Sequence, residues 1–151
     1  MRSGVRLGID VGRARIGVAR SDAAGGLVVP LSTVRRDGRD VARIAQLAQE
    51  YAAVELVVGL PRNMDGTEGA SARDARQYAG RLARRTDLPV RLVDERLSTV
   101  TAHQALHAAG LKERAHRPVV DQVAASVILE QALATEKNTG LPAGELWEGN
   151  A

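Results

Sequence analysis

The stretch LGIDVGRARIGVARSD, residues 7–22, contains two runs of alternating apolar and polar residues joined by a glycine-bearing link. This alternation is typical of β-strands and predicts strands over residues 5–11 and 15–22. Gly12 lies between them, so we expect an antiparallel hairpin. The first strand also carries a carboxylate, Asp10, among apolar residues. Because a buried carboxylate is costly without a partner, Asp10 must meet a hydrogen-bond donor, an arginine or a metal ion.

The rest of the chain alternates between helix and strand patterns. A third strand is predicted near residues 27–35, and it completes an antiparallel meander. The later segments are predicted in this order: helix 39–53, strand 54–60, helix 69–86, strand 89–95, helix 98–110 and helix 119–136. Strands that alternate with helices pair in parallel through right-handed crossovers. We therefore predict an α/β fold with a five-stranded mixed sheet flanked by helices, its first three strands antiparallel and its last two parallel to the first.

The length of 151 residues suits one hydrophobic core, so residues 1–136 are predicted to form a single domain. Residues 137–151, KNTGLPAGELWEGNA, mix Gly, Pro and Glu without periodicity and are predicted to be a loose tail. No apolar run approaches the roughly 18 residues of a membrane helix. The chain has no cysteine, which excludes disulfides and thiolate metal sites. We expect a cytoplasmic protein with no membrane role.

Arginine supplies nearly all of the positive charge, since lysine occurs only at Lys112 and Lys137. The guanidinium fork suits phosphate, which is compatible with a nucleic-acid partner. Taken alone, however, an arginine-rich and alanine-rich composition is better explained by a GC-rich genome, and the formal net charge is only +3. The aromatic residues are Tyr51, Tyr78 and Trp147, so single-strand binding through base stacking is not expected.

Three acids fall where one site can gather them. Asp10 lies on the first strand, Glu95 ends the fifth strand beside Asp94, and Asp121 lies in the first turn of the last predicted helix. Each acid alone has a structural explanation, either an ion pair with a nearby arginine or the favourable dipole of a helix N-terminus. Those explanations do not account for the coincidence of all three.

Converging acids repel one another unless a divalent cation lies among them. Oxygen ligands are those that Mg²⁺ and Mn²⁺ prefer. With a phosphodiester bound, two such ions can activate a water and stabilise the leaving oxygen. The acids therefore indicate nuclease chemistry.

Four motifs carry a family resemblance: LGIDVGRARIGVARSD, VVGLPRNMDGTEGASA, VDERLSTVTA and VDQVAASVILEQAL. In this order they resemble the pre-16S rRNA nuclease family, also called the Holliday-junction-resolvase-like or YqgF/RuvX family. The resemblance implies an RNase H-like fold and a metal-binding catalytic triad of Asp10, Glu95 and Asp121 that holds Mg²⁺ or Mn²⁺, with two ions once substrate is bound. It implies processing of the 5′ end of pre-16S rRNA in ribosome biogenesis. Holliday junction resolution in DNA recombination and repair is the alternative.

Basic and polar residues in or beside these motifs are predicted to bind the substrate: Arg13, Arg15, Arg62, Asn63, Arg96 and Arg117. Ala14 stands where the family usually has a lysine, which puts one phosphate contact in doubt. Asn63 and Gly59 either approach a phosphate, shape the pocket beside the active site, or form an ordinary strand-to-helix turn. Gly12 and Gly17 are expected to let the backbone turn and a phosphate approach closely.

The histidines have weaker roles. His103 and His107 are expected to be a surface pair rather than metal ligands, and His116 is a candidate proton shuttle.

Two other classes of protein remain as alternatives. A noncatalytic RNA-binding or transcription-associated module would keep the fold without the turnover. A nucleotide-binding protein of the actin and sugar-kinase type shares the GIDVG pattern but needs two domains, for which this chain is too short. The sequence leaves open whether the protein is a monomer or a homodimer, and a dimer would favour junction cleavage.

Overall fold

The structure is a computed structural model that describes residues 2–95 and 113–149, with the backbone alone described for residues 113–120. Its elements, in chain order, are β1 (Val5–Val11), β2 (Arg15–Ser21), β3 (Val28–Arg35), α1 (Asp40–Glu50), β4 (Ala53–Leu60), α2 (Ala70–Thr86), β5 (Val90–Asp94), α4 (Glu113–Thr139) and β6 (Glu145–Leu146). The predicted order of strands and helices is confirmed over these residues. The predicted helix at 98–110 lies outside them.

The six strands form one mixed sheet in the order β3-β2-β1-β4-β5-β6. β1, β2 and β3 pair antiparallel, while β4 pairs parallel with β1 and β5 pairs parallel with β4. The predicted mixed sheet is therefore confirmed, with one strand more than the five expected.

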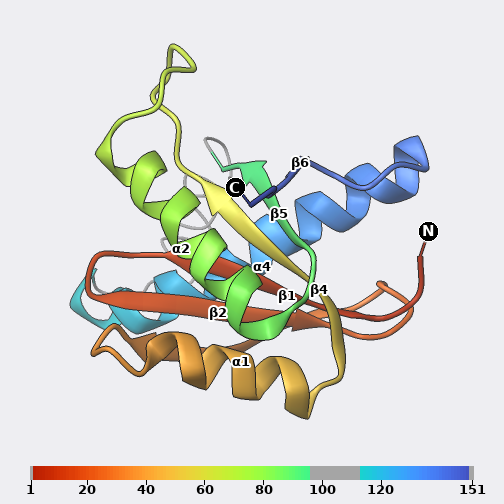
Figure 1. The fold of residues 1–151 in the computed structure, drawn as a ribbon, viewed down its shortest axis with the longest axis horizontal. Helices are drawn as coiled ribbons and strands as arrows, with labels where there is room; N and C mark the ends of the chain where they lie inside the picture. Colours follow the sequence, from red (N-terminus) through yellow and green to blue (C-terminus); the bar gives the residue numbers. More distant parts are fainter. Residues whose placement is uncertain (1, 96–112, 150–151) are drawn as a thin grey trace.

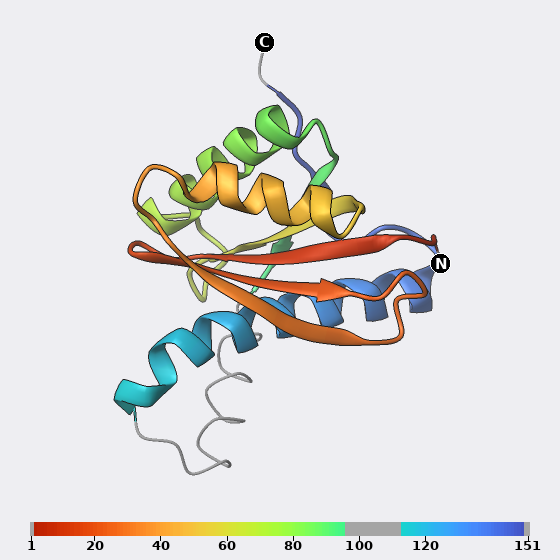
Figure 2. The same cartoon turned by 90° about the horizontal axis from the view of Figure 1, so that it is seen from below.

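Helices cover both faces of the sheet. α1 and α2 lie on one face and α4 runs across the other (Figures 1 and 2). The first face buries most of the core, where Leu7, Ile9 and Leu56 of the strands pack with Ile44 and Tyr78 of the helices. The second face buries a smaller cluster from β4 and α4: Val57, Ile128, Leu129, Ala132 and Leu133. This three-layer arrangement positions the N-terminal half of α4 over β1 and β2.

The sixth strand, β6, lies inside the segment predicted to be a loose tail. It pairs antiparallel with β5, and the Trp147 backbone N–H donates to the Val90 carbonyl at 2.7 Å. The indole packs on Gly80, where an added Cβ would lie 2.7 Å from Trp147 Cζ2. A two-residue strand is too short to produce a recognisable alternation, which is why the sequence pattern missed it.

Helix α4 begins at Glu113, earlier than the predicted start at residue 119. The sequence LKERAHRP, residues 111–118, is polar and basic and was expected to form a loop, but the helix already includes its residues from Glu113 onward. No helix within residues 2–95 and 113–149 is both long and apolar enough to cross a membrane.

An ion-pair network fixes the far end of α4 to the sheet. Arg6, which is 1% exposed, pairs through Nη2 with Glu136 Oε2 at 3.1 Å. Arg2 contacts both Glu136 and Glu55, and Arg91 Nε lies 3.2 Å from Glu55 Oε2. Because these acids are buried, losing an arginine partner would strongly destabilise the contact. The network holds α4 at the end opposite to the candidate site.

Candidate active site at the carboxyl ends of the strands

The register of β1 turns Asp10 toward α4. Residues on a strand alternate between faces, so Leu7 and Ile9 enter the core beneath α1 and α2 while Gly8 and Asp10 face the other side. A Cβ at Gly8 would lie 2.6 Å from the Ala125 carbonyl oxygen of α4, which marks this side as the α4 face. Asp10 is half-buried at the end of that face.

Asp121 of α4 is brought to Asp10 by a glycine on the neighbouring strand. Gly17 of β2 pairs directly with Asp10, so both positions point to the same face. A Cβ at Gly17 would collide with the backbone carbonyl of Asp121. The absence of a side chain therefore lets α4 touch the sheet beside Asp10. Arg15 Nε donates to Asp121 Oδ2 at 2.8 Å, and Gln122 Nε2 donates to Thr33 Oγ1 at 2.9 Å.

Glu95 reaches the same edge of the sheet from β5. Its backbone N–H donates to the Leu60 carbonyl of β4 at 3.2 Å, and its side chain is buried, at 9% exposed. A Cβ at Gly59 would collide with Glu95 Oε2, so this glycine makes the space that the carboxylate fills. Glu95 Oε2 is buried with no hydrogen-bond partner among the described residues. Such an oxygen is costly to bury unless a ligand satisfies it.

The three acids influence one another electrostatically. Burial, and then the nearby Asp121 carboxylate, raise the pKa of Asp10 to about 7. Burial, followed by the charges of Asp10 and Asp94, raises the pKa of Glu95 to about 8. Both raised pKa values mean that the protonated carboxyl is favoured over the carboxylate. A bound cation would instead favour the carboxylate. Asp10 is thus close enough to interact electrostatically with Asp121 of α4 and with Glu95 at the end of β5.

The donor set at this edge fits a hard divalent cation. It consists of carboxylate oxygens and includes the unpartnered Glu95 Oε2, and without a cation the pKa values of Asp10 and Glu95 are raised. Among the described side chains, those of residues 2–95 and 121–149, however, no three from Asp, Glu or His are arranged to hold one ion directly. Asp121 is engaged by Arg15 instead. Carboxylate rotation, together with water and phosphate oxygens, would have to complete the coordination of a metal ion here.

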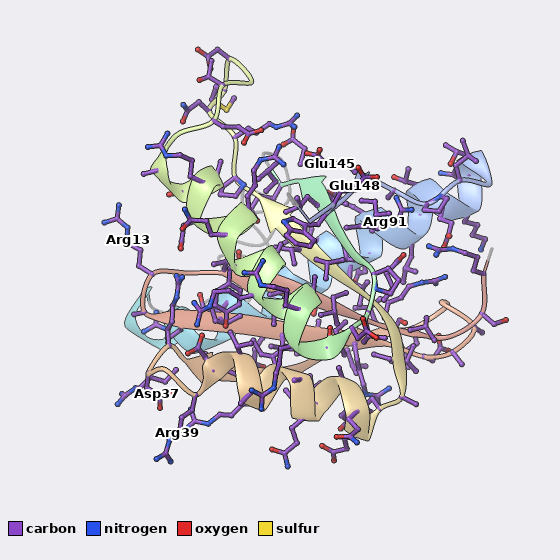
Figure 3. All side chains as sticks on the ribbon, viewed as in Figure 1. Arg13, Asp37, Arg39, Arg91, Glu145 and Glu148 are labelled. Atoms are coloured by element: carbon purple, nitrogen blue, oxygen red, sulfur yellow. The ribbon has the colours of Figure 1, made fainter. Side chains whose placement is uncertain are left out.

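The predicted substrate-binding residues occupy different environments. Arg13 is exposed in the β1–β2 turn and points outward from the body of the protein (Figure 3). Arg15 contacts Asp121, next to the acids. Arg96 lies outside the described residues, and for Arg117 and His116 only the backbone, at the start of α4, is described. Of the predicted substrate-binding arginines with described side chains, Arg15 is thus the one that contacts an acid of the proposed triad.

Arg62 and Asn63 have structural contacts that the sequence did not reveal. The Arg62 guanidinium lies 3.4 Å from Glu68, 3.8 Å from Glu145 and 3.9 Å from Asp94. Asn63 Nδ2 donates to Thr67 Oγ1 at 2.9 Å, and its backbone N–H donates to the Thr67 carbonyl at 2.8 Å. These contacts match the turn alternative for Asn63 and set Arg62 among acids that are distant in sequence.

Two glycines have roles other than the predicted phosphate approach. The space where a side chain of Gly17 would lie is filled by the backbone of α4, and the corresponding space at Gly59 is filled by the Glu95 side chain. Gly12 does form the predicted turn, in which its N–H donates to the Arg15 carbonyl at 2.9 Å. The close approach of another part of the protein, rather than of a phosphate, explains the first two glycines.

A pocket of about 460 Å³ opens beside Glu95, where β1 and β4 end and α2 begins. Its lining includes Gly12, Arg13, Pro61, Ser71, Asp74 and Glu95. Ligands of α/β sheets bind outside the carboxyl ends of the strands. Sequence patterns did not indicate Ser71 or Asp74, because both lie within an ordinary amphipathic helix.

The fold is RNase H-like and is similar to that of RuvC. The Thermus thermophilus structure "RuvC in complex with Holliday junction substrate" aligns with a TM-score of 0.57 over 90% of this chain and 97% of that one. A second T. thermophilus RuvC structure aligns with a TM-score of 0.55. The sequences are only 19% and 20% identical, so this similarity concerns the fold.

The chain belongs to the RuvX family. The sequence model of that family, described as a Holliday junction resolvase, matches residues 4–135. A Thermobifida fusca (strain YX) protein named "Putative pre-16S rRNA nuclease" is 54% identical over 157 residues, covering 99% of this chain and 99% of its own length. A Streptomyces coelicolor protein of the same name is 51% identical, covering 96% of this chain and 89% of its own length. The family resemblance seen in the four motifs is confirmed, and the protein is a member of a nuclease family.

Proposed function

We propose that this protein is a metal-dependent nuclease that hydrolyses phosphodiester bonds in structured RNA and processes the 5′ end of pre-16S rRNA in the cytoplasm. One observation carries the proposal: Glu95 Oε2 is buried without a hydrogen-bond partner among the described residues, while the charge of Asp10 disfavours ionisation of Glu95 and the charge of Asp121 disfavours ionisation of Asp10. A cluster of acids that opposes its own charge needs a cation to become stable when ionised. The names of the relatives supply the RNA substrate.

Asp10, Glu95 and Asp121 would hold the metal. The bound Mg²⁺ or Mn²⁺, two ions once the phosphodiester is present, would supply a nucleophilic water and charge stabilisation for the leaving oxygen. Asp10 lies on a strand that is hydrogen-bonded on both sides, which fixes it better than a loop would. Gly59 fixes the position of Glu95 by leaving it a single space. Arg15 neutralises Asp121 and can donate its remaining N–H groups to the substrate phosphate.

The test is cleavage of two substrates in parallel, a 5′ fragment of pre-16S rRNA and a four-way DNA junction, in Mg²⁺ and in Mn²⁺. Wild type should cut the RNA, and Asp10→Asn should reduce the rate at least a hundredfold. The matched control is Asp87→Asn, at the left-handed residue that ends α2, a conformation that asparagine tolerates. Full activity of Asp10→Asn would overturn the proposed site, and cleavage of neither substrate would favour a noncatalytic RNA-binding module.

Junction resolution is the second candidate function, favoured by the description of the family model. Symmetric cleavage of a junction requires two active sites related by two-fold symmetry, hence a dimer. Preferential cutting of the junction by a protein that sediments as a dimer would select this function over RNA processing.

A further inference from the structure

The pocket beside Glu95 contains a carboxylate that the catalytic proposal does not use. Asp74 of α2 lines it, and Arg36 holds this side chain with two hydrogen bonds of 2.7 Å, one to each oxygen. Arg36 also donates to the Gly12 carbonyl at 3.0 Å, which ties the pair to the β1–β2 turn. The carboxylate is thus fixed in orientation next to the proposed metal ligands.

Asp74 can still accept further hydrogen bonds. The Arg36 guanidinium lowers the pKa of Asp74, so the group is ionised at neutral pH and acts only as an acceptor. A carboxylate offers about four lone-pair sites, of which Arg36 uses two. The Asp74 side chain is 36% exposed, which leaves it accessible from the pocket. Ser71, one helical turn away on α2, adds an exposed hydroxyl to the same wall.

Asp74 and Ser71 favour the sugar of a nucleotide, whereas Arg13, which also lines the pocket, suits the phosphate next to that sugar. None of the described residues lining the pocket is aromatic, so a base has no stacking platform there. An ionised carboxylate repels phosphate but accepts strongly from a hydroxyl. The volume of about 460 Å³ lies within the range of small-ligand sites. The hydroxyl that distinguishes RNA from DNA is the ribose 2′-OH.

We propose that this pocket binds the ribose of a nucleotide adjacent to the scissile phosphate, with Asp74 accepting a hydrogen bond from its 2′-OH, so that the site discriminates RNA from DNA. This inference rests on the proposed nuclease function, because Glu95, a proposed metal ligand, lines the same pocket. A site built to bond a hydroxyl rejects the analogue that lacks it.

The experiment compares an RNA substrate cut by the wild-type protein with versions that carry a single 2′-deoxynucleotide on either side of the cut. One deoxy position should slow wild type about tenfold, the effect of one hydrogen bond to a charged acceptor. Asp74→Ala should slow cleavage of the all-ribose substrate by a similar factor. The variant should then cleave the deoxy substrate at the same rate as the all-ribose substrate. Asp87→Asn, at an exposed residue at the other end of α2 whose left-handed backbone asparagine tolerates, should keep the full deoxy penalty.

The double-mutant cycle separates recognition from a structural effect. If Asp74→Ala acted only by freeing Arg36, the rate reductions caused by the substitution and by the 2′-deoxynucleotide would be independent and would multiply. That result would overturn the inference. Equal rates of wild type on the ribose and deoxy substrates would also overturn it while leaving the nuclease function intact. If wild type cuts no substrate, dissociation constants of the same oligonucleotides in Mg²⁺ give the test without cleavage. In that case a ribose preference lost in Asp74→Ala supports the pocket, and no preference overturns it.

Discussion

Glu95 has room for its carboxylate because the adjacent strand carries glycine at position 59. The same crowding that positions Glu95 leaves Oε2 without a hydrogen bond, and the burial raises its pKa. A site of this kind gives up stability in the free protein in order to hold a reactive group in place. Glu95 placement therefore depends on a residue that has no functional group of its own.

Gly59→Ala should reduce cleavage about a hundredfold, because its Cβ would collide with Glu95 Oε2 and would lie 2.6 Å from Ile128 Cδ1. A displacement of a catalytic group by about 1 Å is enough for a loss of this size. Initial rates at saturating Mg²⁺ check the prediction, with thermal melting to confirm folding. Gly26→Ala is the control, since a Cβ there meets nothing within 4 Å. An unchanged rate for Gly59→Ala would show that Glu95 needs no fixed position.

The contribution of Asp10 and Glu95 to the stability of the metal-free protein should fall as pH rises from about 4 to about 8. The pKa of Asp10 is raised from 3.8 to about 7, and that of Glu95 from 4.5 to about 8. Between the pKa values of the unfolded and the folded state, the folded protein retains protons that the unfolded chain has lost. The contribution of the two acids to the free energy of unfolding is therefore fully present below pH 4 and is lost as they ionise in the folded state. Melting temperatures in EDTA measure this effect. The Asp10→Asn, Glu95→Gln double variant should show a weaker pH dependence.

Adding a metal ion should stabilise the protein most at the pH where the metal-free acids destabilise it. Mg²⁺ should raise the melting temperature of wild type more at pH 8 than at pH 5, because ionised carboxylates bind the cation. A Mg²⁺ effect of the same size in the Asp10→Asn, Glu95→Gln variant would contradict the assignment of these residues as ligands.

At the scale of elements, α4 is held at both ends by different means. Its far end is bound by the buried ion pairs of Glu136 with Arg2 and Arg6. Its near end rests on the glycines of β1 and β2, where backbone meets backbone. Close contact at the near end determines the distance between Asp121 and Asp10, so the site depends on packing between the helix and the sheet.

Gly17→Ala should destabilise the protein by about 1–3 kcal/mol, the usual effect of overpacking, because the new Cβ would strike the Asp121 carbonyl. The helix must shift, and activity should fall as Asp121 moves away from Asp10. Urea denaturation measures the free energy of unfolding, with Gly26→Ala again as the control. Wild-type stability and activity in Gly17→Ala would mean that α4 tolerates displacement from the sheet.

At the scale of the whole molecule, local sequence patterns predicted the secondary structure, but they did not predict contacts between residues that are distant in the sequence. Alternation and helical spacing predicted the strands and helices, because each pattern reports burial of one face. The family motifs singled out Asp10, Glu95 and Asp121. The acid cluster around Arg62 was not predictable, since Glu145 is brought to it by a two-residue strand that leaves no pattern. The tight contacts at Gly17 and Gly59 likewise depend on tertiary packing.

The distribution of arginines over the molecule predicts which of them govern salt dependence. Arg13 is exposed in the turn beside the acids and is free to reach a phosphate, whereas Arg62 lies among Glu68, Asp94 and Glu145. Each phosphate contact on a duplex contributes about 0.9 to the slope of log binding constant against log salt.

Arg13→Ala should therefore lower that slope by about 0.9, and Arg62→Ala should leave it unchanged. Binding of a duplex RNA by fluorescence polarisation across a salt series measures both. Arg85→Ala serves as the control, because Arg85 is exposed in the last turn of α2, at the end of that helix away from the pocket. If Arg62→Ala changed the slope as much as Arg13→Ala, its acidic neighbours would have to release it on binding. The ion-pair cluster would then be part of the nucleic-acid interface rather than of the scaffold.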